Sequence, residues 1–315
     1  MRVCASTVFL APPQYKRSKV RLSLSKKMNM AKILSFFCVL VLLNGCVTQK
    51  QKKGDVAQKE FRTTFTFAMV KFIPVIPVDI NGEGKNFLFD TGADLTVVQR
   101  DTLKGKVTKF SGASNRKMEL GSEIISSLIV GDVNFRNTAA LNGNLTGLKE
   151  QIPAFGGLIG TPIIQKANWL FNFSTKKLTV SNANLADETF QSIKIKRKSG
   201  APYTSINIDG KEYDALIDMG SSAGLSIPEN SPLAKELLKK YKFEEIVREV
   251  FTLGGLQKVK EKTSTLPKLT IGNIEFKDVS LDIRPSSQMR IGSRFFRDYI
   301  LYIDNINRDF KIKIK

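Results

Sequence analysis

Two Asp-x-Gly segments are the residues of this sequence best suited to chemistry. Asp90 ends an apolar run and is followed by Thr91 and Gly92, and Asp218 ends a second apolar run, two residues before Gly220. Glycine permits tight turns and the close approach of a neighbouring chain. Two carboxylates brought close together cannot both ionise easily, so the pair holds one proton. One carboxylate can then activate a water molecule while the other protonates a carbonyl oxygen, which would hydrolyse an amide.

Composition removes most other hydrolytic chemistries. The chain has no histidine, and its three cysteines, Cys4, Cys38 and Cys46, all precede residue 47. A Ser-His-Asp or Cys-His site, or a zinc site built on His or Cys, is therefore excluded for residues 47–315. Carboxylates, Lys, Ser/Thr or Tyr must carry any catalysis, and a Ser-Lys dyad has no local signature. We expect neither a cofactor nor a metal.

The two acidic segments lie at the same place in two similar stretches of chain. Residues 74–90 and 202–218 align without a gap, and each reads as a strand, a turn and a second strand that ends at the aspartate. The turns are an Asn-Gly pair at 81–82 and an Asp-Gly pair at 209–210. Such pairs are the strongest short signals for a β-hairpin. We therefore expect each aspartate to follow the second strand of a hairpin directly.

The similarity continues after each acidic segment. The further matched segments are 128–135 with 269–276, 158–160 with 290–292, and 169–180 with 301–312. Short alternating runs of this kind favour strands. We expect a mostly β protein with two similar β-rich lobes related by internal duplication, over 63–185 and 190–315. A pseudo-twofold axis between them would bring both acidic loops to one interface.

Only short helices are expected. Residues 231–240 begin with a Ser cap and carry Pro at the first helical position. A turn or two of helix is expected at 161–167 and at 293–298, after the two Ile-Gly pairs.

These motifs resemble those of the retropepsin-like and pepsin-like aspartic peptidases. The matching residues are Asp90, Thr91, Gly92 and Ala93 in the first half and Asp218, Met219, Gly220 and Ser221 in the second. The resemblance runs from about Phe65 to the C-terminus. It implies closed, barrel-like lobes of the acid-protease type, with Asp90 and Asp218 as the catalytic residues. It also implies a peptide or protein substrate and a monomer whose two lobes replace a dimer.

Two residues depart from the family pattern. In this family the residue after each catalytic aspartate is Thr or Ser, whose hydroxyl bonds to the opposite loop; Thr91 fits, but Met219 cannot make that bond. Arg290 replaces an apolar residue before the second Ile-Gly pair, a milder departure. Two functions therefore stay open: an aspartic endopeptidase, and a non-catalytic protein that binds an extended peptide by strand addition. A blander interpretation is that both aspartates only bond their own turns.

Glycine-bearing turns are candidates for flaps, the hairpins that close over the substrate in this family and exclude water. Gly112 in segment 110–115, and Gly254 and Gly255 in segment 251–256, lie where such hairpins belong. Ordinary surface turns explain the same glycines equally well.

The N-terminal segment reads as an export signal. Residues 33–43 form an apolar run that is too short to span a bilayer comfortably. The Leu-Asn-Gly-Cys sequence that ends at Cys46 resembles the lipobox of bacterial lipoproteins; the alternative is an ordinary signal peptide with a chance cysteine. We expect an over-called start at 1–29, a signal peptide at 30–45, a lipid on Cys46 and a tether at 46–62. Such an anchor places the protein on the outer membrane of a bacterial envelope, facing the periplasm.

The charge of the chain does not indicate nucleic-acid binding. The formal net charge is +20, from 49 basic and 29 acidic residues. The lysines are scattered through the predicted strands and turns, whereas a nucleic-acid surface gathers basic residues with aromatic ones. We interpret them as a solvated basic surface, with a weak attraction to anionic lipid or cell-wall polymer as the alternative.

Overall fold

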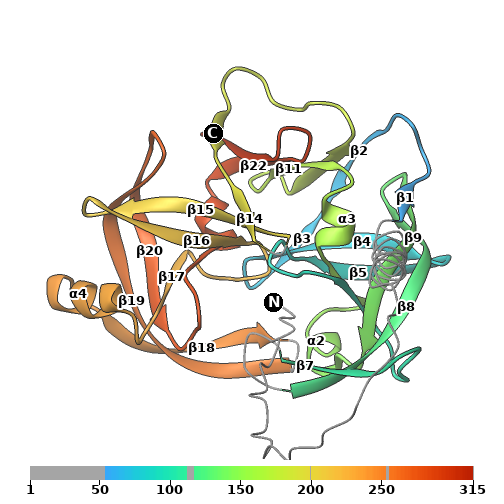
Figure 1. The fold of residues 1–315 in the computed structure, drawn as a ribbon, viewed down its shortest axis with the longest axis horizontal. Coiled ribbons are helices and arrows are strands. Elements are labelled where there is room, and N and C mark those ends of the chain that lie inside the picture. Colours follow the sequence, from blue (N-terminus) through green and yellow to red (C-terminus); the bar gives the residue numbers. More distant parts are fainter. Residues whose placement is uncertain (1–53, 112–116, 199, 253–254, 315) are drawn as a thin grey trace, which may run out of the picture.

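A computed structural model describes residues 54–111, 117–198, 200–252 and 255–314. Regular structure in this part of the chain is almost all β (Figure 1). One sheet lies in each half of the chain, and a third sheet joins the halves. The predicted fold class, mostly β with two similar β-rich lobes, is confirmed.

The first lobe is a sheet closed on itself. Its strand order is β1-β9-β6-β10-β5-β4-β8-β7, with β3 added to β4, and an extra pairing of β8 with β9 closes the barrel. Apolar side chains fill its interior, as for Ile76, Phe87 and Phe89, which are fully buried. The strands are β1 (Asp55–Val56), β3 (Ala68–Val70), β4 (Ile73–Ile80), β5 (Glu83–Phe89), β6 (Thr96–Gln99), β7 (Thr108–Ser111), β8 (Lys117–Val130), β9 (Val133–Gly143) and β10 (Phe155–Ile159).

The second lobe repeats this arrangement. Its order is β14-β15-β16-β21-β17-β20-β19-β18, and the pairing of β15 with β19 closes the barrel. Each strand from β15 onward has a counterpart at the same place in the first lobe, so that β15, β16 and β21 correspond to β4, β5 and β10. The strands are β14 (Lys196–Lys198), β15 (Ala201–Ile208), β16 (Lys211–Asp218), β17 (Leu225–Pro228), β18 (Glu244–Thr252), β19 (Gly255–Ile271), β20 (Ile274–Arg284) and β21 (Arg290–Gly292).

A six-stranded sheet holds the lobes together, at the top of Figure 1. Its order is β13-β23-β22-β11-β12-β2, and β11 pairs with β22 in antiparallel fashion, with Trp169 opposite Ile303. Trp169 is fully buried, and its Nε1 donates to the Ile164 carbonyl at 2.8 Å. The strands are β2 (Arg62–Thr66), β11 (Asn168–Asn172), β12 (Lys177–Ser181), β13 (Gln191–Ile193), β22 (Tyr299–Asp304) and β23 (Asp309–Ile314).

The two predicted hairpin turns have the same backbone conformation. Asn81 and Gly82 have φ of 54° and 86°, and Asp209 and Gly210 have φ of 53° and 81°. Two successive positive φ values match the twist of the flanking strands, and Asn-Gly and Asp-Gly tolerate them best. The prediction that a hairpin delivers each aspartate is confirmed.

The helices are short, as expected. Helix α4 (Pro232–Lys240) has its predicted cap, because the Ser231 hydroxyl accepts a hydrogen bond from the Ala234 amide at 3.1 Å. Single turns follow the two Ile-Gly pairs as α3 (Thr161–Ile164) and η1 (Ser293–Phe296), and α2 (Thr146–Lys149) was not predicted. In the described part of the chain, no helix combines the length and apolar character needed to cross a membrane.

The segment predicted as a tether, 46–62, contains a short strand. Asp55–Val56 forms strand β1, which pairs with β9 at the edge of the first lobe. The Arg136 guanidinium bonds both carboxylate oxygens of Asp55, at 2.9 and 3.1 Å. A polar composition suggested a linker, but one bidentate ion pair and a free sheet edge are enough to dock this segment.

Candidate active site

Both aspartates lie at the same structural position in their lobes. Asp90 directly follows β5, and Asp218 is the last residue of β16. Each strand is flanked by a parallel neighbour, β10 for β5 and β21 for β16. Asp90 and Asp218 are 2% and 3% exposed. The closed barrels therefore deliver two buried carboxyl groups from the ends of central strands.

The two loops face each other across the junction of the lobes. The Gly92 amide donates to Asp90 Oδ1 at 2.9 Å, and the Gly220 amide donates to Asp218 Oδ1 at 3.0 Å. The carboxyl groups of Asp90 and Asp218 lie within hydrogen-bonding reach of each other. Amide hydrogen bonds favour an ionised carboxylate, and a hydrogen bond between carboxyl groups needs one proton. The pair is therefore arranged to share a single proton.

The glycines make this approach sterically possible. A Cβ added to Gly92 would lie 2.8 Å from Asp218 Cγ, and one added to Gly220 would lie 2.4 Å from Asp90 Cγ. Real Cβ atoms do not come this close to another carbon. Each Asp-x-Gly loop therefore needs its glycine for the opposite loop's carboxylate rather than for its own turn.

Thr91 joins the two loops. Its hydroxyl donates to the Ile217 carbonyl at 2.7 Å and accepts from the Met219 amide at 3.0 Å. Both partners belong to the second lobe, and Thr91 is 2% exposed. Buried hydrogen bonds of this kind fix the relative position of the two carboxylates.

Met219 occupies the position equivalent to Thr91 and has no hydroxyl for the reciprocal pair of bonds. Its side chain is fully buried and packs in the main apolar core. Only one half of the interloop connection is therefore made. The hydrogen bonds from Thr91 are complete, and apolar packing holds the other side.

Arg290 lies beside Asp218. Its Nε is 3.1 Å from Asp218 Oδ2, and both side chains are at least nine-tenths buried. Strand pairing shows its counterpart: Leu216 faces Arg290 on β21, as Leu88 faces Leu158 on β10. The departure noted as mild in the sequence thus places a guanidinium against one of the two carboxylates. An arginine aligned with a buried leucine was the sequence signal for this contact.

The two carboxyl groups differ in proton affinity. Burial and, secondarily, the charge of Asp218 raise the pKa of Asp90 to about 6. Burial acts in the same direction on Asp218, but the Arg290 guanidinium, the bond from Asp90 and the Gly220 amide hold its pKa below the ordinary value. These opposite shifts favour Asp90 as the protonated group of the pair and Asp218 as the ionised one.

The predicted flaps coincide with two hairpins. Strands β7 and β8 form one, and β18 and β19 form the other, with Thr252 paired to Gly255 at its end. Gly255 starts β19, whereas Gly112 and Gly254 lie outside the described residues, as does Cys46.

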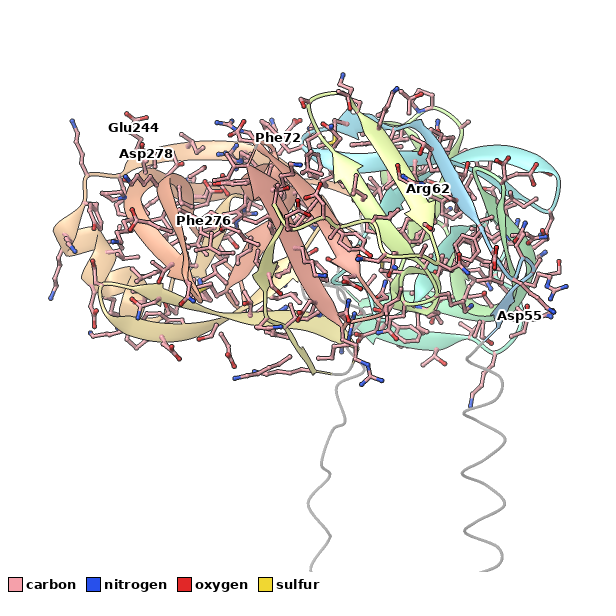
Figure 2. The ribbon with its side chains drawn as sticks, turned by 90° about the horizontal axis from the view of Figure 1, so that it is seen from above. Asp55, Arg62, Phe72, Glu244, Phe276 and Asp278 are labelled. Carbon is pink, nitrogen blue, oxygen red and sulfur yellow. The ribbon has the colours of Figure 1, made fainter. Side chains whose placement is uncertain are left out.

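The second hairpin reaches across to the first lobe. Lys71 Nζ, on the turn between β3 and β4, is 2.8 Å from Glu249 Oε2 on β18. Leu256 packs against apolar residues of the first lobe. Figure 2 shows Phe72, on the same turn as Lys71, at the upper edge of the view and about midway along the molecule. The hairpin is therefore supported from both lobes.

A cavity of about 620 Å³ lies on the second-lobe side of the aspartate pair. Asp218, Gly220 and Ser221 form one end of it, and Val250 and Thr252 of the hairpin form one wall. Ala93 and Ser221 follow the two Asp-x-Gly motifs; Ala93 is fully buried, and the Ser221 hydroxyl accepts from the Ala223 amide at 3.4 Å. Ser221 is thus used in its own turn.

Metal-ion chemistry gains no support from the donor set. Among the described residues, no three His, Cys, Asp or Glu side chains gather in a group that could hold a metal ion.

A family model described as aspartyl protease matches residues 204–295. This segment contains Asp218, Met219 and Gly220 and runs from β15 through η1. No curated protein matches the sequence. This match confirms the predicted resemblance to aspartic peptidases.

Proposed function

We propose that this chain, whose residues 204–295 are of the aspartyl protease family, is an endopeptidase that uses Asp90 and Asp218 as one dyad. Asp218, ionised beside Arg290, accepts a proton from the attacking water. Asp90 donates its proton to the carbonyl oxygen of the scissile amide. The interloop bonds of Thr91 and the amides of Gly92 and Gly220 hold both carboxyl groups in position, so little reorganisation of the protein is needed.

The observation that carries the proposal is the double hydrogen bond of Thr91 across the lobes. Its hydroxyl bonds the carbonyl of Ile217 and the amide of Met219, the two residues that flank Asp218. A chance juxtaposition of two turn aspartates would not need this connection. The supporting observation is steric, because each glycine leaves room only for the opposite carboxylate.

The decisive experiment is cleavage of an unfolded protein mixture by the full chain in detergent, between pH 3 and 8. Cleavage should be fastest below about pH 6, where Asp90 keeps its proton, and should fall as the pH rises through that value. The variants Asp90→Asn and Asp218→Asn should each reduce the rate by about 10² to 10⁴-fold. If the folded parent is silent at every pH, the peptidase proposal fails.

A second function, peptide binding without cleavage, is favoured by Met219, which removes half of the interloop connection. An extended peptide would then bind in the cleft by strand addition. Under this proposal Asp90→Asn leaves the affinity for peptides unchanged and no condition yields cleavage. Fluorescence anisotropy with the same peptides separates the two functions.

We also propose that the chain is a monomer held on a membrane by a lipid on Cys46, on the outer membrane facing the periplasm. The support is the lipobox-like sequence ending at Cys46, which lies outside the described residues. In a bacterial host, Cys46→Ala should move the protein from the membrane fraction to the soluble fraction and abolish labelling by palmitate. Sedimentation in detergent should give one chain per particle.

A further inference from the structure

The two lobes differ most in the side chains beneath the hairpins. The pairing of Ser122 with Leu141 in the first lobe corresponds to that of Thr263 with Asp282 in the second. The same register makes Glu261 the counterpart of Leu120. Leu120, Leu141 and Leu158 are buried in an apolar cluster. Their counterparts Glu261, Asp282 and Arg290 are buried as well, so charge replaces hydrocarbon at three equivalent sites.

Three arginines surround the two buried acids of the second lobe. Arg294 Nη2 is 2.9 Å from Asp282 Oδ2, and Arg248 Nε bonds Glu261 Oε1. Arg284 is paired more loosely, at 3.5 Å from Glu261 and 3.5 Å from Asp282. Arg284 Nε and Glu261 Oε2 are buried and have no hydrogen-bond partner among the described residues. Arg284 is therefore the least satisfied member of this ionic cluster.

The cluster and its neighbour carry excess positive charge. Four guanidinium groups, those of Arg248, Arg284, Arg290 and Arg294, face three carboxylates, those of Asp218, Glu261 and Asp282. Among the described residues, Asp218 is the one carboxylate that forms an ion pair with Arg290, with Nε 3.1 Å from Oδ2. Burial of an uncompensated charge is costly unless a counter-charge arrives. Glu229, on the cavity wall, is exposed and is offset by Lys258 and Lys260 there.

Two of these arginines open into the same cavity. Arg284 and Arg290 line the 620 Å³ space that ends at Asp218, and their side chains are 12% and 10% exposed. The cavity is walled by Val250 and Thr252 of the hairpin. A group that enters it from a peptide lying on the two aspartates would meet two guanidinium groups that are themselves largely buried.

We infer that this second-lobe cavity binds a carboxylate of the substrate peptide through Arg284 and Arg290. The carboxylate is an acidic side chain next to the scissile bond or the free C-terminus of a short product-like segment. Guanidinium groups bind carboxylates with paired, charge-assisted hydrogen bonds, which gives geometric selectivity. The inference rests on the proposed function only in that the cleft holds an extended peptide. The equivalent first-lobe position, lined by leucines, would take an apolar side chain.

The test measures binding apart from cleavage. The full-length Asp90→Asn protein is titrated with fluorescent peptides that carry one Glu or one Gln scanned through each position, with free or amidated C-termini. At pH 6, Glu at one position, or the free C-terminus, should strengthen binding at least about tenfold over its neutral analogue. At pH 3 the carboxylate is protonated, so the preference should disappear.

Variants assign the effect to the cavity. Arg284→Gln should remove most of the preference for the carboxylate, and Arg284→Lys should keep part of it. Arg136→Gln, an exposed arginine of the first lobe, is the matched control and should leave the preference intact. Thermal melting checks that each variant is folded.

The outcomes separate the two proposals. A preference confined to internal Glu identifies an acidic side chain, and one confined to the free C-terminus identifies a terminal carboxylate; either supports the inference. Binding with no preference at any position, or a preference that folded Arg284→Gln retains in full, overturns it. If the parent never cleaves but the preference is present, the cavity assignment stands and the peptidase proposal fails. If the parent cleaves but shows no preference for a carboxylate, the peptidase proposal stands and the cavity assignment fails.

Discussion

The two lobes share strand order, turn chemistry and the placement of an aspartate, yet they differ at the positions around the dyad. The first lobe presents Thr91 and Leu158, and the second presents Met219 and Arg290 at the same places. In the first lobe hydrogen bonds reach out to the other loop, whereas in the second an ion pair holds the carboxylate from within its own lobe.

This difference shows which features the fold requires. Barrel closure depends on strand register and on hairpin turns, and both are kept in the two lobes. The side chains around the aspartate pair contribute less to barrel closure, so apolar residues there can be replaced by charged ones. The exchange of Leu158 for Arg290 places a guanidinium beside Asp218, and in the proposed dyad this favours a proton on Asp90 and a charge on Asp218. Four substitutions test or sharpen the comparison.

The largest effect is expected from Gly220→Ala. The new Cβ would lie 2.4 Å from Asp90 Cγ, so the carboxyl group must move. A displacement of about 1 Å at a reacting group can cost 10²-fold in rate, and we expect at least that loss in kcat. Gly92→Ala, at 2.8 Å from Asp218 Cγ, should be slightly less damaging. Gly84→Ala has open space around its Cβ and is the control; equal activity of all three would contradict the loop geometry.

Thr91→Val should come next. It keeps the shape of the side chain but leaves the Ile217 carbonyl and the Met219 amide buried without their partner. We expect a loss of about 2–4 kcal/mol in the free energy of unfolding, measured with urea, together with a lower kcat. Thr64→Val, at an exposed hydroxyl pair, should change stability by less than about 1 kcal/mol. An unchanged urea midpoint for Thr91→Val would show that the interloop bonds are not structural.

Arg290→Leu makes the second lobe resemble the first. Arg290 lowers the pKa of Asp218, so its removal raises that pKa. Cleavage needs Asp218 ionised, so the acid limb of the pH–rate profile should move to higher pH by about one unit. The rate should fall by about tenfold only at pH values below both the original and the raised pKa of Asp218, by less than about fivefold at pH 4, and little near pH 6. The control Arg136→Gln should leave the acid limb in place. If Arg290→Leu also leaves it in place, the ion pair does not control the ionisation of Asp218.

Met219→Thr should have the smallest effect on rate and should raise it. By the symmetry of the loops its hydroxyl would face the Phe89 carbonyl, which completes the interloop connection. We expect a several-fold higher kcat, with a loss of about 1–3 kcal/mol in stability because a fully buried side chain becomes smaller. Met219→Leu keeps the volume without the hydroxyl and should leave kcat unchanged. If both variants behave alike, the missing hydroxyl is irrelevant to catalysis.

Local sequence signals predicted much of the secondary structure and the position of both aspartates. The Asn-Gly and Asp-Gly turns, the Ser231 cap and the gapless repeat gave the hairpins, helix α4 and the paired aspartates, because each depends on neighbours in sequence. Strand β1 was missed, since its docking depends on Arg136, far away in the chain. Helix α2 was missed because a single turn has neither a capping side chain nor a periodic pattern.

The ionic cluster could not be read from the chain in the same way. Glu261, Asp282 and three arginines come from β18, β19, β20 and η1, and charged residues in such strands are normally solvated. Extension of the repeat alignment back from Leu128 and Leu269 would have set Glu261 against Leu120. That alignment would indicate an acidic residue at a core position, but it would not identify the arginines that pair with it.

The amino-acid sequence alone specified the two Asp-x-Gly loops, the strands that precede them and the absence of histidine, which together favour carboxylate chemistry. Three contacts become visible only in the folded structure. Thr91 bridges the two loops, Arg290 pairs with Asp218, and Arg284 lines the adjoining cavity. The physical reason is that these contacts join strands distant in sequence. Their energies depend on register, facing and burial, which exist only once both barrels have closed.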